Sequence, residues 1–499
     1  MTLTALIASL YAWVNWSGAR QLRNVEAMLK AEGETLDFRE TMNEPVPEAE
    51  NFCAIPLLKD LALVVDNDPD KGAPGQNRKR LQAMKLPMVK YGEFLPRRAN
   101  AAVGIRTDLK GWADYLRKDG SYKMPADSGD AARDVLAALD KHDAIIQELA
   151  AGISRAKAQL TPEWKKRELP ELLLSLQYPE YSTILDVARS LSLRVAASTR
   201  TGDAAKAHQA ALLLARFNQA CLNEPCLIGL LLGATETTML HSGIWELCSA
   251  NLGTVEDFVR LEGVLKSFDI HRFALRAFRS EMAAGVNAAQ YCKRKPENIR
   301  RMSNNGASDD GVFSHIPERL IPSGFFDISA AVIAEHEFKY LVKPLREQGW
   351  QAAYQTSQEF EKQMVEIKRA AGAKPSYILL MLMAPALNSF ISHLIYTDAL
   401  VNQSIIACAL ERYRIEKGSY PDSLDAVRLA DGKPLPLDPI HEKPMGYRNT
   451  ADGKYALWSV GFDGKDDGGK RTLNEKKPEN TQFHKTDYVG DWVWDFPAE

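Results

Sequence analysis

The chain has 499 residues, a formal net charge of -3 and an average globular composition, with 45% hydrophobic and 25% charged residues. This length predicts two to four domains of roughly 150 residues each. The near-neutral charge excludes the basic footprint that nucleic-acid binding requires, and the densest basic stretch, Arg78 to Arg80, is interpreted as a solvated loop. The six cysteines form no CxxC pair, so they predict buried apolar side chains and no zinc site.

The first residues predict a membrane anchor. No charge occurs from Met1 to Ala19, and Trp13 and Trp16 stand where interfacial aromatic residues would lie. A membrane span needs about 20 apolar residues, so we interpret this shorter run as the tail of an anchor that starts upstream of Met1. An ordinary amphipathic helix is the alternative. Arg20 and Arg23 favour a cytoplasmic location for the downstream chain, and basic residues in an upstream segment would reverse that preference. The expected location is the periplasmic side of the cell envelope, with the cytoplasm as the alternative.

The apolar pattern predicts a mainly α chain. After a helix over 20–35, an extended segment over 40–56 and an irregular one over 66–100, a helix is expected from Asp130 to Leu160. The clearest helical pattern follows between residues 180 and 292. Asp203 and Thr254 are expected as N-caps there. The predicted helices of this part are 184–198, 211–220, 226–247, 255–268 and 272–292. These helices resemble tetratricopeptide-like hairpins without the full repeat consensus, which implies a surface for protein partners.

Turn-forming residues then predict a loop or strap over 294–326. A helix is expected to resume from about Ile328 to Ala371. The apolar stretch from Tyr377 to Ile395 has the length of a membrane span, but Pro385, Asn388 and His393 argue against exposure to lipid. We therefore predict a long buried helix from Pro385 to Glu416, with a second membrane helix as the alternative.

The last residues carry the most specific pattern, an α+β module over 403–499. A helix ends at Gly418, which suits a left-handed C-cap, and Tyr420-Pro421 follows. A Leu-Pro-Leu-Asp-Pro turn occupies 435–439. Strands are then predicted from Met445 to Asn449 and from Tyr455 to Val460, joined by an Asp-Gly turn, and an acidic glycine-rich turn over 461–469 ends this sheet.

This order of motifs resembles the soluble domain of the type II secretion major pseudopilin. That family has a Tyr-x-x-x-x-Gly-x-Tyr-Pro helix end, and the matching residues here are Tyr413, Gly418, Tyr420 and Pro421. Its hairpin ends in a Tyr-Ser-x-Gly-x-Asp-Gly pattern, matched here by 458–464, and its terminal Asp-Ile-x-x-Trp is echoed by 487–492. The resemblance covers about a fifth of the chain. A pseudopilin begins with an apolar helix directly after a short leader, whereas this module follows a long helical region.

The pseudopilin resemblance also implies a calcium site. Calcium binds six to eight oxygens, which here would come from loop carbonyls and from four carboxylates: Asp463, Asp466, Asp467 and Asp487. Two features depart from the family pattern: Lys465 and Lys470 would compete with the ion, and a Lys-rich stretch precedes Asp487. The alternative is a solvated acidic turn.

The whole chain resembles membrane-anchored envelope proteins of planctomycete and verrucomicrobial bacteria, including their Glu-Asn segment, here Glu50-Asn51. This resemblance implies an architecture and no activity. The expected divisions are an anchor over 1–19, a mixed region over 20–125, a helical repeat-like domain over 126–293, a strap over 294–326, a helical continuation over 327–402 and the module over 403–499.

These features predict a non-catalytic envelope scaffold that binds other proteins. The sequence has no phosphate-loop lysine, no second zincin histidine and no Gly-x-Ser-x-Gly elbow. One alternative is a hydrolase with a cleft between the helical domain and the tail, for which Glu335 and Glu337 are candidate carboxylates. The other is an accessory component of a secretion or pilus system. The aromatic tail with Trp492, Trp494 and Phe496 is expected to pack against the sheet.

Overall fold

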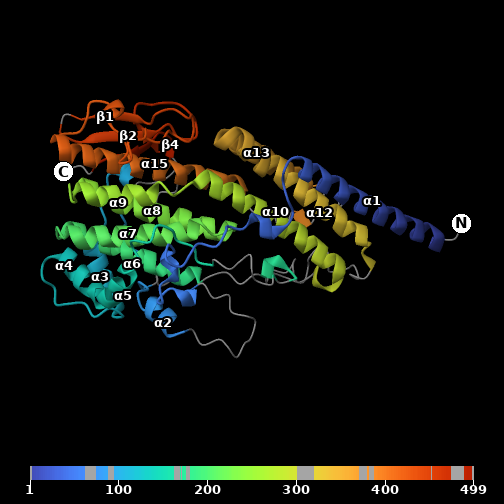
Figure 1. The fold of residues 1–499 in the computed structure, drawn as a ribbon, viewed down its shortest axis with the longest axis horizontal. Coiled ribbons are helices and arrows are strands. Elements are labelled where there is room, and N and C mark those ends of the chain that lie inside the picture. The colour runs from blue at the N-terminus through green and yellow to red at the C-terminus, as the bar shows by residue number, and fades with distance from the viewer. Residues whose placement is uncertain are drawn as a thin grey trace.

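The computed structural model confirms a mainly α chain with a small C-terminal α+β module (Figure 1). It describes residues 3–61, 75–87, 95–161, 169, 171–175, 180–299, 320–369, 379–380, 387–450, 452–473 and 488–496. The α-helices are α1 (Leu3–Ala31), α2 (Gln76–Gln82), α3 (Leu109–Asp119), α4 (Ala131–Leu139), α5 (Asp143–Ala150), α6 (Tyr181–Arg200), α7 (Ala204–Leu222), α8 (Leu227–Ser249), α9 (Val255–Leu265), α10 (Ile270–Arg294), α12 (Ser323–Glu337), α13 (Lys343–Arg369) and α15 (Leu387–Lys417). The strands are β1 (Gly446–Asn449), β2 (Tyr455–Ser459), β3 (Arg471–Leu473), β4 (Tyr488–Gly490) and β5 (Trp492–Trp494).

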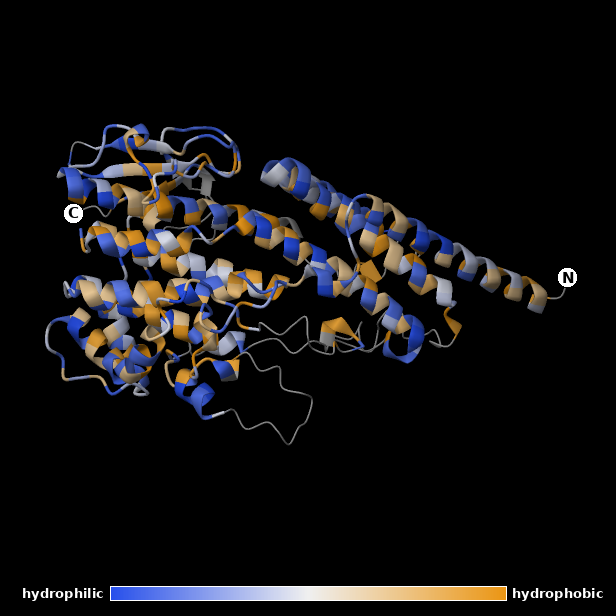
Figure 2. Ribbon diagram, in the orientation of Figure 1, coloured by the Kyte–Doolittle hydropathy of each residue, from blue (hydrophilic) through white to orange (hydrophobic). Residues whose placement is uncertain are grey.

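The helical body is a stack in which α6, α7 and α8 pack against one another (Figure 1). Helix α9 packs against α7 and α15, and α15 also lies against α8. Most residues of α6, α7 and α8 are buried, many of them apolar, and Figure 2 colours much of these helices as hydrophobic. Burial of this apolar surface is the main force that holds such a stack together.

Local signals in the sequence place the ends of these helices. The Asp203 carboxylate accepts a hydrogen bond from the Lys206 amide at the start of α7, as expected of an N-cap. Thr254 and Asp257 form a reciprocal capping box at the start of α9. At the end of α15, Gly418 takes a φ of +85°, and its amide donates to the Arg414 carbonyl, which is the left-handed C-cap that its position predicts.

A second group of helices, α1, α12, α10 and α13, extends away from the stack and carries the N-terminus at its far end (Figure 1). Helices α1 and α12 approach at two glycines. A Cβ on Gly18 would lie 2.3 Å from the Gly324 carbonyl oxygen, and a Cβ on Gly324 would lie 2.2 Å from the Val14 carbonyl oxygen. The Asn15 side chain accepts a hydrogen bond of 2.8 Å from the Gly324 amide. Only residues without a side chain permit this backbone contact.

Buried ion pairs fix the residues that follow α1. The Glu34 carboxylate, with a side chain that is 1% exposed, pairs with Arg279 of α10 at 2.6 Å and with Arg346 of α13 at 2.8 Å. Glu32 pairs with Lys343 and Arg346. Two bidentate-capable guanidinium groups on one carboxylate give this junction a defined geometry.

The C-terminal sheet has the strand order β1-β2-β5, and both pairs are antiparallel. The predicted hairpin is confirmed, with Gly446 opposite Trp458 and Asn449 opposite Tyr455. The aromatic tail does pack against the sheet as expected, because β5 joins β2 as an edge strand and buries Trp492 and Trp494. Strands β3 and β4 form a separate two-stranded pair.

The module is continuous with the helical body. Helix α15 runs unbroken from Leu387 to Lys417, so the division expected between residues 402 and 403 falls inside one helix. Through its amide nitrogen, Gln403 on this helix donates to the Trp492 carbonyl at 2.6 Å, and its amide oxygen accepts from His241 Nε2 of α8 at 3.2 Å. The Trp245 indole of α8 donates to the Asp495 carbonyl. These contacts attach the sheet to α8 as well as to α15.

Three expected elements differ from the structure. The helix predicted over 130–160 is two helices, α4 and α5, which are separated by a 3-10 turn at Asp140–His142 and end before Gly152. The helix predicted over 328–371 contains a π-turn at Phe338–Val342 and a break at Gly349, where φ is +76°. The basic stretch at Arg78 to Arg80 lies in helix α2 and pairs with Glu180 and Glu148, whereas a solvated loop was expected.

Most of the strap predicted over 294–326 lies outside the described residues.

Candidate functional site

The acidic turn after β2 uses its own carboxylates as hydrogen-bond acceptors. Asp463 accepts from the Lys465 amide at 3.1 Å. Asp466 accepts from the Trp458 indole and from the Gly468 amide, both at 2.9 Å. These bonds stabilise the tight turn because each satisfies an amide or indole donor that the chain reversal would leave unpaired.

Asp491, at the start of β5, completes the turn. This buried carboxylate accepts from the Gly469 amide at 2.7 Å and from the Asp467 amide at 3.4 Å. Burial raises the pKa of Asp491, and the two amides oppose that shift. Arg448 of β1 donates to the Gly468 carbonyl at 3.0 Å. One of the loop carbonyls expected to bind calcium therefore already accepts a hydrogen bond from a guanidinium group.

The structure describes three of the four predicted calcium ligands: Asp463, Asp466 and Asp467. Among the residues that the structure describes, no group of three or more His, Cys, Asp or Glu side chains is placed to hold a metal ion. Asp463 and Asp466 face the amides of their own turn, and Asp487 lies outside the described residues. The calcium site therefore stays a prediction that rests on the family resemblance. The position of Asp487, its fourth predicted carboxylate, is not described.

The motif residues of the module have structural contacts. The buried Asp438 of the Leu-Pro-Leu-Asp-Pro turn accepts from the Val460 amide at 3.0 Å and from the Ile440 amide at 2.8 Å. The Tyr420 hydroxyl donates to the buried Glu411 carboxylate of α15, which also pairs with Arg414 at 2.8 Å. Tyr420 and Tyr455 pack edge to face at 4.8 Å. These contacts join the turn, the helix and the sheet into one packed unit.

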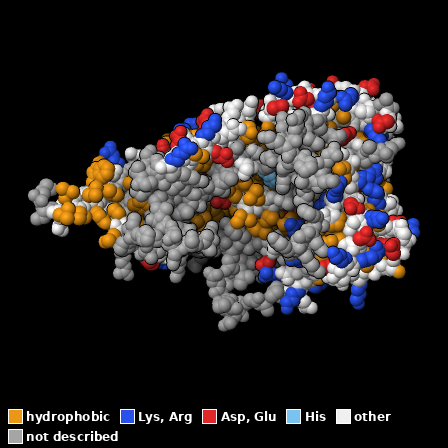
Figure 3. Space-filling view, turned by 180° about the vertical axis from the view of Figure 1, so that it is seen from behind, with side chains coloured by type: hydrophobic (Ala, Val, Ile, Leu, Met, Phe, Trp, Pro, Cys, Tyr) orange, Lys and Arg blue, Asp and Glu red, His pale blue; other side chains and the backbone are white. Residues whose placement is uncertain are grey.

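The N-terminal part of α1 exposes a series of large apolar side chains. Residues 3–10 are exposed on every side of the helix. Leu3 is 76% exposed, Leu10 54%, Trp13 61% and Trp16 57%. Figure 3 shows these hydrophobic side chains gathered at the projecting end of the molecule. Arg20 stacks its guanidinium over the Trp16 ring at 5.3 Å. Among the described residues, no helix combines the length and apolar character that crossing a membrane requires.

The carboxylates considered for a hydrolase lie on different sides of α12. Glu335 is exposed, whereas Glu337 is buried and has a pKa that burial and Glu281 raise well above its ordinary value. His336, between them, hydrogen-bonds the Val332 carbonyl of its own helix at 2.8 Å. These three residues therefore do not converge on a common point.

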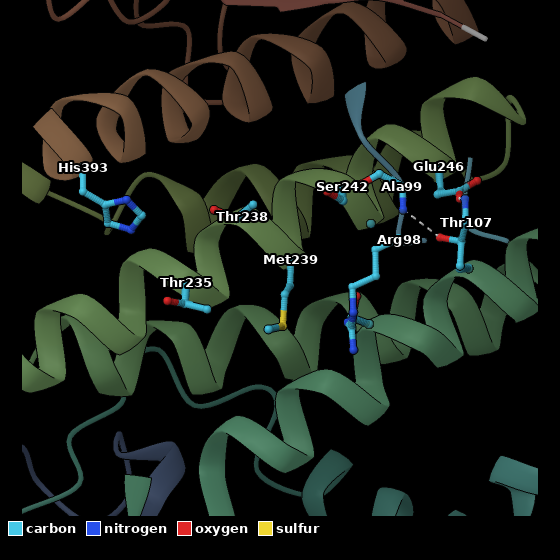
Figure 4. A pocket seen from close by; sticks show the side chains of 12 residues that line it. Arg98, Ala99, Thr107, Thr235, Thr238, Met239, Ser242, Glu246 and His393 are labelled. Carbon is cyan, nitrogen blue, oxygen red and sulfur yellow. Dashed lines mark hydrogen bonds between the residues drawn. The ribbon is translucent and has the colours of Figure 1, made fainter. Parts of the chain in front are cut away.

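A cavity of about 260 Å³ lies between α6, α8, α15 and the segment 95–107 (Figure 4). Its walls include Ala196, Met239, Glu246 and His393, and Arg98 extends along one side. Sequence reasoning missed this site, since its lining residues are scattered over 296 positions and form no motif. The one local signal is the polar face of α8, where Thr235, Thr238, Ser242 and Glu246 recur at helical spacing within an apolar helix.

Comparisons of the sequence and the structure with protein-family models, with curated proteins and with solved structures found no match.

Proposed function

We propose that this protein is a membrane-attached, non-catalytic scaffold of the cell envelope, with a pseudopilin-like C-terminal module. The observation that carries the proposal is the exposed start of α1, which has no charged side chain. We propose that a lipid bilayer covers this part of the helix. The helical body and the sheet then lie at the membrane surface, where the stacked helices α6–α10 offer a surface to protein partners.

The distribution of apolar side chains favours lipid over a protein partner. A helix that docks on a protein presents one apolar stripe and keeps its other face polar. Here Leu3, Leu6, Ile7 and Leu10 recur at i, i+3, i+4 and i+7 and form one exposed apolar stripe. The opposite face carries only Ala, Thr and Ser side chains, and the chain has no charged side chain between Met1 and Ala19. Without a charged face, this part of the helix can lie against hydrocarbon.

The residues at the end of this run suit the membrane interface. Trp13 and Trp16 are both largely exposed, one turn apart, and indole rings favour the headgroup level of a bilayer. Arg20 and Arg23 follow and are exposed, so their guanidinium groups can reach lipid phosphates. The tight contact with α12 involves Val14, Asn15 and Gly18, so protein packing replaces the proposed lipid contact from about residue 14 onwards.

The proposal is tested by flotation of the full chain with phosphatidylcholine vesicles. Leu6→Glu combined with Leu10→Glu should abolish flotation, because two charges would enter the hydrocarbon at a cost of about 2.5–3.5 kcal/mol each. The matched control is Ile228→Glu with Leu231→Glu, which alters two exposed apolar residues of α8 in the body. Flotation that persists in the α1 variant, or that the control abolishes equally, would overturn the proposal.

A further inference from the structure

The cavity between α6, α8, α15 and the segment 95–107 has a mostly apolar wall with one cation. Ala196 of α6 and Met239 of α8 contribute apolar surface, and Arg98 enters from the loop segment (Figure 4). Its volume of about 260 Å³ is just below the roughly 300 Å³ at which ligand pockets commonly begin. The cavity therefore suits a small molecule.

The hydroxyl groups of the wall are bound to the protein itself. Ser242 donates to the Ala99 carbonyl at 3.1 Å, and Thr107 accepts from the Ala99 amide at 3.1 Å. Thr235 and Thr238 donate to carbonyls one turn earlier in α8, at 3.0 and 3.3 Å. Three of these four hydroxyls already donate within the protein, so they have little donor capacity left for a ligand.

Arg98 differs from these groups because no described residue compensates its charge. Among the described residues, its guanidinium forms no ion pair, and its buried Nη1 has no hydrogen-bond acceptor. Its one described partner is the Trp112 ring, at 5.6 Å from the guanidinium carbon. Desolvation and, to a smaller extent, the nearby positive charge of Arg189 lower the pKa of Arg98 to about 10. Arg98 as a whole is half-buried, and its buried Nη1 is a donor without an acceptor, so an anion in the cavity would satisfy a group that the described residues leave unpaired.

Glu246 does not supply that anion. Its carboxylate, which is 1% exposed, accepts from the Thr107 amide at 2.8 Å through Oε1, and its Oε2 has no partner among the described residues. No ion pair joins Glu246 to Arg98. Burial raises the pKa of Glu246, which favours the protonated acid and weakens its attraction for a cation.

We propose that this cavity binds a small organic anion with an apolar body, such as a short-chain carboxylate. The carboxylate of the ligand pairs with the Arg98 guanidinium, and its hydrocarbon chain lies along Ala196 and Met239. An inorganic anion would leave the apolar wall unused, and a neutral molecule of the same shape would leave Arg98 uncompensated. A site that recognises a charged group rejects the ligand that lacks it.

The test is calorimetric titration of the full chain with hexanoate, hexanol and hexylamine. Hexanoate should bind in a saturable way, and hexanol and hexylamine should bind at least about tenfold more weakly, because only the carboxylate pairs with Arg98. This comparison needs no variant. The absence of saturable heat from hexanoate up to about 10 mM, or hexanol binding as well as hexanoate, would overturn the proposal.

Two variants assign the binding to this cavity. Arg98→Met should weaken hexanoate by at least about tenfold, while the melting temperature of the free protein should change little, since methionine keeps an apolar chain beside Trp112 and removes a charge that no described anion pairs with. Met239→Trp should also weaken hexanoate, because the larger side chain fills the cavity. The matched control is Arg189→Met, which removes the neighbouring cation that pairs with Asp186 and should bind hexanoate like the wild type. Unchanged affinity in Arg98→Met would contradict the proposed carboxylate contact.

Discussion

The glycine contact between α1 and α12 gives a prediction whose size follows from the structure. A Cβ added at Gly18 would lie 2.3 Å from the carbonyl oxygen of Gly324 and 2.8 Å from its Cα. Both are backbone atoms, so no side-chain rotation can relieve the overlap. Gly263 in α9 is the matched control, because a Cβ there meets no heavy atom within 4 Å.

The two substitutions to alanine should have opposite effects. Overpacking costs about 1–3 kcal/mol, and replacing a helical glycine with alanine gains about 0.5–1 kcal/mol. Gly18→Ala should therefore destabilise the docking of α1 by about 1–2 kcal/mol, whereas Gly263→Ala should stabilise α9 by the propensity gain alone.

Hydrogen exchange followed by mass spectrometry measures each effect locally. In Gly18→Ala, amides over residues 10–24 should exchange about 5- to 30-fold faster, which is what a loss of 1–2 kcal/mol implies. In Gly263→Ala, amides of α9 should exchange more slowly or at the same rate. Unchanged or slower exchange around residue 18 in Gly18→Ala would refute the close contact and, with it, the position of α1 against α12.

Three further predictions concern charge. Glu34→Gln should lower the free energy of unfolding by about 2–3 kcal/mol in guanidinium denaturation, because Arg279 and Arg346 lose a buried carboxylate. The control Glu50→Gln breaks an exposed ion pair with Lys157 and should cost at most about 1 kcal/mol. Equal losses in the two variants would contradict this prediction. Burial raises the pKa of Glu236 to about 8. As the pH rises from the unfolded-state pKa of this carboxyl towards 8, the free energy of unfolding of the wild type should fall relative to that of Glu236→Gln, by up to about 1.4 kcal/mol per pH unit, and the difference should level off above pH 8. A difference between the two proteins that does not vary with pH would refute the raised pKa. The pseudopilin resemblance predicts that the full chain binds Ca²⁺ in calorimetric titration and that Asp463→Ala abolishes the heat; no heat in the wild type would remove the calcium site.

The parts of the fold that could be predicted from sequence are those with local signals. The caps at Asp203 and Thr254 fix helix starts because their side chains bond amides only a few residues away. The Asp-Gly turn sets the hairpin register in the same way. The full length of α15 followed from its continuous apolar character and the glycine at its end.

The parts that were missed depend on contacts between distant residues. The break between α4 and α5 has no Gly or Pro to announce it, and the 3-10 turn there places Asp140 and Asp143 against Arg194 of α6. Neither Gly18 nor Gly324 stands in a sequence pattern that predicts a contact. The need for glycine at both positions becomes visible only in the packing of α1 on α12. Arg98 and Met239 come together in one cavity through tertiary packing alone, which no periodicity predicts.

The central claim, that the start of α1 lies in a lipid bilayer, is tested most directly by a fluorescent probe on that helix. All six native cysteines are buried, and burial raises the pKa of every one of these thiols, so a cysteine introduced at Leu10 can be labelled selectively. With an environment-sensitive dye at this position, phosphatidylcholine vesicles should shift the emission to the blue, whereas the same dye at Val365, an exposed apolar position of α13, should not respond. Emission from position 10 that stays unchanged when vesicles are added would contradict the account.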